Sequence, residues 1–359
     1  MNLNFKISNY SNLYIFFLLL ALIKFFFSTT NLYAKGFNIN NVEISTKFEI
    51  NFNKEDVLDE GFEIAFNKLI NTILKSSDLR TINKVSLNEI KSMIETFSIK
   101  EEKFINQVYY VNLDVTFNKK QIFDLLEKRN IFPSLPIKNK IFLLPIIIDE
   151  NKNELFIFSN NFILNNINQD SQSNELLEYV LPSEDLEDLK LIKDNIQNIE
   201  NYDFSKIINK YFLNDYVITL LFQGSDQLRV LSKINFNNKK FIDNKTFTNL
   251  NFVTMENQNR LIQIIKTTYE DQWKLINQIN TSIKLPLTIS IENNESLKIS
   301  KFEKTLTELD LIYDFNINKF DHKKIIYKVI FNGSPDNFFT TMANFGYQFV
   351  FKDQVWVLR

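Results

Sequence analysis

Residues 141–148 read IFLLPIII, an apolar run in which only Pro145 departs from large aliphatic and aromatic side chains. A continuous apolar run of this length predicts a strand that is buried on both faces, or a strand that ends at the proline. A second run, Tyr216–Phe222, has the same character, and Arg229–Phe236 can pair with it as a hairpin. Residues 138–280 are therefore expected to form an α/β domain.

Three helices are expected around these strands. Helical patterns occupy residues 183–196 and 204–212, and a longer one occupies 255–279. Apolar residues recur at helical spacing along the longest pattern, which indicates a side that packs on a core rather than a cofactor site.

A first α+β domain is expected over residues 36–132. A helix over 55–74 has pairs of apolar or small residues every four positions, which predicts a wide buried stripe. Ser86, with Glu89 three positions later, predicts the start of a second helix with an apolar side of Leu87, Ile90, Ile94 and Phe97. Residues 109–117 then alternate apolar and polar side chains, the pattern of a half-buried strand.

Residues 282–359 are expected to form a third domain. Their alternating and helical patterns follow in the order β-α-β-β-α-β-β, with Ser334 as an N-cap, Pro335 at the first helical position and Gly346 just past the helix end. This order predicts a ferredoxin-like domain with an added strand. The fold class is thus α+β, with two or three small α/β-layer domains behind an N-terminal hydrophobic segment.

Residues 1–34 have the layout of a secretory signal peptide. The apolar run Leu13–Ile23 is followed by Lys24 and three phenylalanines. This run is shorter than the ~20 residues that span a bilayer comfortably, so cleavage before Lys35 is favoured. The alternative is an uncleaved membrane anchor through residues 13–27, and a buried core helix is disfavoured because no polar face exists. Signal and anchor both place the remaining chain in the periplasm.

Composition excludes several function classes. Net charge is −2, which gives no electrostatic footprint for nucleic acid. The chain has no Cys and a single His, so thiol nucleophiles, disulfides and sites built from several His or Cys ligands are impossible. His322 lies between two strand-like runs and is expected in an exposed turn. No catalytic, cofactor-binding or metal-ligating residue is predicted.

The best carboxylate group is Glu184, Asp185, Glu187 and Asp188. On a helix, Glu184 and Asp188 would share a face, and two carboxyls are what a glycosidase needs. The stronger interpretation is a helix start, because Pro182-Ser183 followed by acidic residues suits the positive end of the helix dipole. Asp114 lies on the polar face of the 109–117 strand, and a catalytic role for it would need a partner.

Taken together, five features resemble the bacterial family catalogued as domain of unknown function 2066. They are the 37–131 pattern, the 141–148 strand that ends in an aspartate, Leu181-Pro182 before acidic residues, the 216–222 strand, and the C-terminal Phe331-Asn332-Gly333 to Trp356-Val357-Leu358. The Ala- and Arg-rich helices typical of that family are missing. The first domain also resembles, more loosely, the N-terminal module of envelope proteins in flagellar or outer-membrane assembly.

This resemblance implies an envelope protein without known catalytic residues. The expected function is a non-catalytic exported interaction or assembly module, with envelope proteins as partners, no nucleic acid and no cofactor. The alternative is a cell-wall-active hydrolase that uses the carboxylates of residues 184–188.

Overall fold

The computed structural model describes residues 37–359 apart from 83, 170–174, 249 and 294–295. The chain is mixed α+β, as predicted, and its described strands form three sheets. The predicted signal or anchor, residues 1–34, lies outside the described residues. None of the helices in the described ranges is long and apolar enough to cross a membrane.

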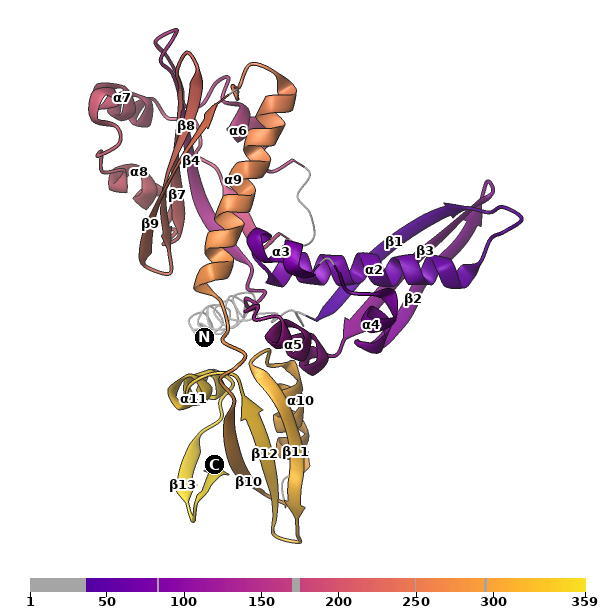
Figure 1. The fold of residues 1–359 in the computed structure, drawn as a ribbon. Helices are drawn as coiled ribbons and strands as arrows, with labels where there is room; N and C mark the ends of the chain where they lie inside the picture. The colour runs from indigo at the N-terminus through magenta and orange to yellow at the C-terminus, as the bar shows by residue number, and fades with distance from the viewer. Residues whose placement is uncertain (1–36, 83, 170–174, 249, 294–295) are drawn as a thin grey trace, which may run out of the picture. The chain divides into compact units, whose positions relative to one another are not determined.

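The first sheet has the order β1-β3-β2 and is antiparallel (Figure 1). Its strands are β1 (Asn38–Lys47), β2 (Ile94–Ile105) and β3 (Val108–Phe117), and its helices are α2 (Lys54–Ile73), α3 (Ser76–Ile82), α4 (Leu87–Ser92) and α5 (Lys119–Lys128). The predicted helix over 55–74 and strand over 109–117 are confirmed. Gly61 lets α2 approach this sheet closely, since a Cβ there would lie 2.6 Å from Leu113 Cδ1.

The predicted second helix is correct at its start and wrong at its end. Ser86 accepts a hydrogen bond from Glu89 N, as a capping residue does, but the helix ends at Ser92. Ile94 and Phe97 belong to β2 instead, where they pair with β3. Their spacing fits a helix face, but pairing along β3 satisfies the backbone groups on one side of β2, and this long-range pairing decides the structure.

The second sheet has the order β5-β4-β7-β8-β9, with β6 also paired to β4. Its strands are β4 (Asn139–Asp149), β5 (Glu154–Phe156), β6 (Leu177–Val180), β7 (Tyr216–Gln223), β8 (Gln227–Phe236) and β9 (Lys239–Thr248). Its helices are α6 (Phe162–Asn166), α7 (Leu186–Asp194), α8 (Ser205–Ile208) and α9 (Met255–Ile276), with short 3-10 turns at Ile196–Asn198 and Asn209–Tyr211.

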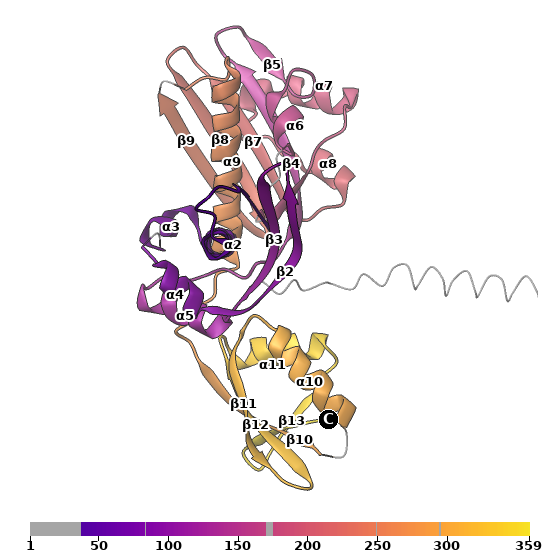
Figure 2. The same cartoon turned by 90° about the vertical axis from the view of Figure 1, so that its right-hand side faces the viewer.

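Both faces of this sheet are buried, which explains the continuous apolar runs. Ile141, Leu143 and Ile147 of β4 pack in the core under α9 and α6, whereas Phe142 and Leu144 pack in the core on the α7 and α8 side. Figures 1 and 2 show α9 along one face of the strands and α7 and α8 on the other. The predicted strands over 141–148 and 216–222 and the helix over 255–279 are confirmed, and β4 is parallel to β7.

Strand β4 continues through Pro145 rather than ending there. On one side β7 pairs with β4 from Phe142 to Asp149; on the other side, β6 stops at Phe142 and β5 begins at Ile147. Pro145 lies in the gap between β6 and β5, so no strand on that side needs a hydrogen bond from the N–H that proline lacks. Its carbonyl accepts a hydrogen bond of 2.9 Å from Asn161 Nδ2 instead.

The third sheet has the order β11-β12-β10-β14-β13. In chain order its elements are β10 (Leu285–Glu292), α10 (Ser296–Glu308), β11 (Ile312–Phe320), β12 (Lys324–Phe331), α11 (Pro335–Asn344), β13 (Phe349–Lys352) and β14 (Val355–Leu358). Ser334 caps α11 and Gly346 adopts φ +83°, as their residue types predict. β14 lies next to β10 and is parallel to it.

The end of α9, with Ile279 just beyond it, completes the hydrophobic core of residues 37–131, which we call the first core. Lys274 Nζ donates to Asn71 O (2.6 Å) and Leu74 O (3.0 Å) at the end of α2, and Asp271 Oδ1 accepts from Ser76 N at the start of α3. Ile279 is buried among the side chains of residues 37–131. Helix ends need such partners because their last carbonyls have none within the helix.

Candidate functional site

The carboxylates of residues 184–188 form a helix N-terminus. Asp185 is the N-cap of α7 and accepts from the N–H groups of Glu187 and Asp188. Lys210 Nζ lies 2.8 Å from Asp185 Oδ2 and 2.7 Å from Asp188 Oδ1, and Lys206 binds Glu187. The hydrogen bond from Lys210 lowers the pKa of Asp185. Glu184 precedes the cap, so the predicted shared helix face of Glu184 and Asp188 is wrong.

Asp114 and His322 lie in separate structural settings. Asp114 accepts a hydrogen bond from Asn41 N, where the register of β1 shifts, and forms an ion pair of 3.2 Å with Lys100. His322 is exposed in the turn between β11 and β12, where Asp321 accepts from two backbone N–H groups. Asp114 therefore supports a strand irregularity, and His322 occupies the predicted exposed turn.

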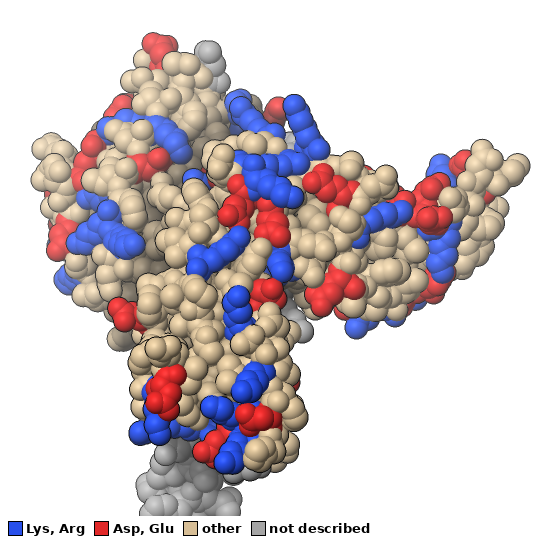
Figure 3. Space-filling view, turned by 60° about the horizontal axis from the view of Figure 1, so that its bottom comes forward, with Lys and Arg blue, Asp and Glu red and all other residues tan. Residues whose placement is uncertain are grey.

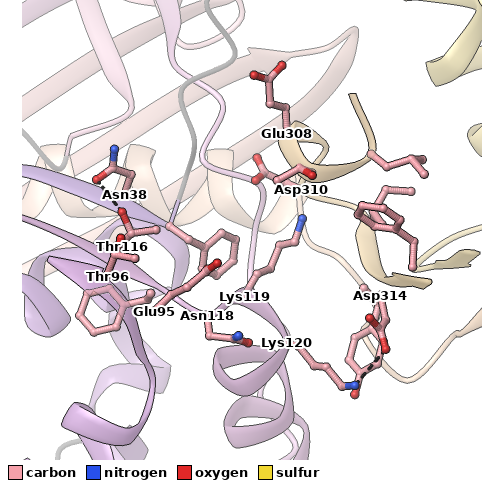
Figure 4. A pocket seen from close by; sticks show the side chains of 17 residues that line it. Asn38, Glu95, Thr96, Thr116, Asn118, Lys119, Lys120, Glu308, Asp310 and Asp314 are labelled. Carbon is pink, nitrogen blue, oxygen red and sulfur yellow. Dashed lines mark hydrogen bonds and ion pairs between the residues drawn. The ribbon is translucent and has the colours of Figure 1, made fainter. Parts of the chain in front are cut away.

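One pocket, of about 420 Å³, lies between α5, β11 and the end of α10 (Figure 4). Its polar lining consists mainly of Asn38, Glu95, Thr96, Thr116, Asn118, Lys119, Lys120, Glu308, Asp310 and Asp314. Sequence reasoning missed it, because its walls come from segments about 190 residues apart. Carboxylates outnumber lysines in this lining.

Lys119 extends from the first position of α5 into this pocket (Figure 4). Its Nζ donates a 2.5 Å hydrogen bond to Leu309 O, and Leu309 N in turn donates to Thr305 O in the last turn of α10. Burial lowers the pKa of Lys119 to about 8, against the opposing fields of Asp310 and Glu95. A cation at the C-terminal end of a helix is stabilising, so Lys119 acts as a cap for α10.

The same side of α5 contacts β11 through a group of polar contacts around Tyr313. Tyr313 donates a 2.6 Å hydrogen bond to Asp124 Oδ1, and burial raises the pKa of Tyr313 to about 12. Lys120 pairs with Asp314 at 3.0 Å, and Lys284 Nζ lies 4.4 Å from the centre of the Tyr313 ring. These contacts pack α5 against β11, and they do not have the arrangement of a catalytic acid–base pair.

A second candidate is the exposed surface of β2. Every β2 residue after Ile94 is exposed, and among the strands that the structure describes, β2 pairs with β3 alone, on one side. Phe97, Ile99 and Phe104 lie opposite buried residues of β3 and thus on the α2 side of the sheet, yet they are 48%, 38% and 57% exposed. Helix α2 packs mainly on β1 and β3 and leaves this face of β2 open. We call these three side chains and the free edge of β2 the β2 surface.

Aromatic rings border the β2 surface at both ends. Phe97 lies edge-on to Phe62 of α2 at 5.1 Å between ring centroids, and Phe104 lies edge-on to Phe48 at 4.7 Å. This surface was not predicted, because the helical spacing of the sequence led to a helix that included Phe97. A signal was present in Asn106-Gln107, since both residues adopt positive φ in the turn that joins β2 to β3, and Asn favours such turns.

Neither the distribution of surface charge nor the placement of metal-ligating side chains indicates a further site in the described part of the chain. On the face in Figure 3, lysines and arginines are interspersed with aspartates and glutamates, without a large area of one sign. Within the described ranges, no three His, Asp or Glu side chains gather in a way that could hold a metal ion.

Comparison with known proteins identifies no family. No family model matches the chain. Protein Ycf2 of Physcomitrium patens is 23% identical over an alignment of 340 residues that covers 80% of this chain. The alignment covers 15% of that much longer protein, so this chain spans a small part of its length.

Proposed function

We propose that this protein is a non-catalytic module for interaction or assembly in the bacterial cell envelope. The β2 surface is the observation that supports this most directly, because it combines a strand edge that no described strand pairs with and three exposed apolar side chains. An edge of this kind is a template for pairing with another chain, and proteins usually cover or shorten it. The lysine partners of Asp185, Glu187 and Asp188 support a structural role for those carboxylates rather than the hydrolase alternative.

We place the protein in the periplasm, either soluble after cleavage or held at the inner membrane by residues 13–27. The sequence order of residues 1–34 supports this. Fractionation of tagged cells with N-terminal sequencing is expected to give a periplasmic form that starts near Lys35. An intact membrane-bound form would support the anchor, and an intact cytoplasmic form would refute export.

The remaining fine assignments are also proposals. The order β-α-β-β-α-β-β over 285–358 supports a ferredoxin-like domain in which the added strand β14 lies between β10 and β13. The sequence features noted above support a distant relationship to the domain of unknown function 2066 family. Envelope proteins are the partners that the proposed family relationship favours.

The interaction role is tested by recovery of partners from an envelope extract. The tagged wild-type chain is expected to retain envelope proteins, and Phe97→Ser/Phe104→Ser is expected to lose most of them, because both exposed anchors are removed. Ile317→Ser/Phe320→Ser is the matched control, since these residues of β11 are 52% and 64% exposed. Equal loss in both double variants, or no specific envelope protein with the wild type, would count against the proposal.

A further inference from the structure

We infer that the β2 surface pairs with β2 of a second copy of this chain, antiparallel and edge to edge. This inference rests on the proposed interaction role and names its partner. The residues that support it are those of β2 itself, Ile94–Ile105, with the sequence IETFSIKEEKFI.

An irregularity in β2 selects the partner. Ile99 lies opposite Leu113 and Glu101 lies opposite Asn112, so Lys100 is an extra residue in β2. A bulge of this kind interrupts pairing with a regular strand and is one of the devices that protect sheet edges. A second β2 has the same extra residue. When the two-fold axis passes between Lys100 and Glu101, the two bulges face each other and the pairing on either side stays in step.

This register also places side chains on matching faces. It sets Phe97 opposite Phe104 of the second copy and Ile99 opposite Glu102. All four residues lie on the α2 side of their own sheet, because they are opposite buried residues of β3. Without the extra residue, positions 97 and 104 would point to opposite faces.

Charge complementarity distinguishes this register from its neighbours. Lys100 lies opposite Glu101 of the second copy, and the two-fold axis repeats this pair. Moving one strand by two residues in one direction puts Lys100 opposite Lys103 and Glu101 opposite Glu102. Like charges directly opposite each other destabilise a sheet, whereas opposite charges and aromatic pairs stabilise it.

Moving the strand by two residues the other way is also unfavourable. That shift puts Phe97 opposite Glu102 and Phe104 opposite Glu95, so both aromatic rings lose each other as partners and face a carboxylate instead. The register centred between Lys100 and Glu101 is thus the one that sets Phe97 against Phe104 and Lys100 against Glu101.

Charge exchange tests the pairing in the full-length chain, solubilised in a mild detergent. Sedimentation across a concentration series is expected to show a monomer–dimer equilibrium for the wild type. Lys100→Glu is expected to weaken dimerisation by at least about tenfold, because two attractive pairs become repulsive. Lys100→Glu/Glu101→Lys is expected to restore it. Both variants lose the contact of Lys100 with Asp114, so restoration separates pairing from a folding defect.

Cysteine cross-linking tests the register, since the chain has no Cys of its own. Ser98→Cys/Lys103→Cys is expected to form a covalent dimer with diamide as oxidant, because position 98 lies opposite position 103 of the second copy. Within one strand these positions are about 16 Å apart, too far for a disulfide. Ser98→Cys alone is the control and is expected to remain monomeric, because in this register its thiol lies opposite Lys103 and about 16 Å from the thiol of the second copy.

The outcomes separate this inference from the proposed function. A monomer at every concentration, an unchanged dimer in Lys100→Glu, or equal cross-linking in both cysteine variants would overturn self-pairing. If envelope proteins are still recovered through Phe97 and Phe104 in that case, the partner is a different chain and the interaction role stands. If neither dimer nor partner is found, both proposals are refuted.

Discussion

Asn161→Ala is expected to lower the free energy of unfolding by about 3–5 kcal/mol. Asn161 is fully buried. Its Nδ2 donates to the carbonyls of Pro145 and Ile157 at 2.9 and 3.1 Å and, at 3.3 Å, to that of Phe156; its Oδ1 accepts from two N–H groups at the start of α6. The substitution leaves all of these backbone groups without this partner.

Tryptophan fluorescence during urea unfolding measures this effect. Trp273 lies in the core beside α6, and Trp356→Phe removes the signal of the third sheet. Asn195→Ala is the control, because half-buried Asn195 makes one side-chain hydrogen bond, to Leu191 O. The control is expected to lose about 1 kcal/mol or less. Similar losses in both variants would contradict the role assigned to Asn161.

The stability of the wild type relative to Lys119→Met is expected to rise between pH 8 and pH 10. The pKa of Lys119 is lowered from 10.5 to about 8 in the folded chain, so the unfolded chain binds more protons in this interval. The free energy of unfolding therefore increases with pH in this interval, and the gain is lost again as the pH falls through the folded-state pKa of Lys119. Over the whole interval the free energy of unfolding rises by about 3 kcal/mol as an upper bound.

Chemical unfolding at several pH values, followed by circular dichroism, measures this difference. Lys120→Met is the matched control at the next position. The hydrogen bond to Asp314 raises the pKa of Lys120, so its removal is not expected to flatten the rise with pH. Parallel pH profiles for the wild type and Lys119→Met would show that the Lys119 amine is not held in a desolvated state.

The sequence predicts the parts of the fold whose side-chain pattern has one structural solution. Strands β4 and β7 could be predicted because burial on both faces makes their middle residues almost entirely apolar, Thr219 excepted, and β3 because apolar and polar side chains alternate from Tyr109 to Phe117. Strand β2 could not, because Leu87, Ile90, Ile94 and Phe97 satisfy helical spacing up to the point where pairing with β3 takes over.

The candidate sites were less predictable than the strands. Residues 184–188 were correctly interpreted as a helix start, since a capping aspartate and acidic first turn are local signals. The pocket around Lys119 depends on a contact with Leu309, 190 residues away, and no local pattern encodes it. The hydrogen bonds of Asn161 likewise depend on the carbonyl of Pro145, which lies in β4, 16 residues earlier in the chain.

The way α9 completes the first core determines when that core can form during synthesis. Lys274 and Ile279 are translated about 200 residues after the helix end that Lys274 caps. Until they emerge from the ribosome, α2 has uncapped carbonyls and residues 37–131 lack part of their core. Such long-range closure is slow, and it keeps the nascent chain loosely folded. For a chain exported as proposed, this delay favours threading through a translocation channel before folding.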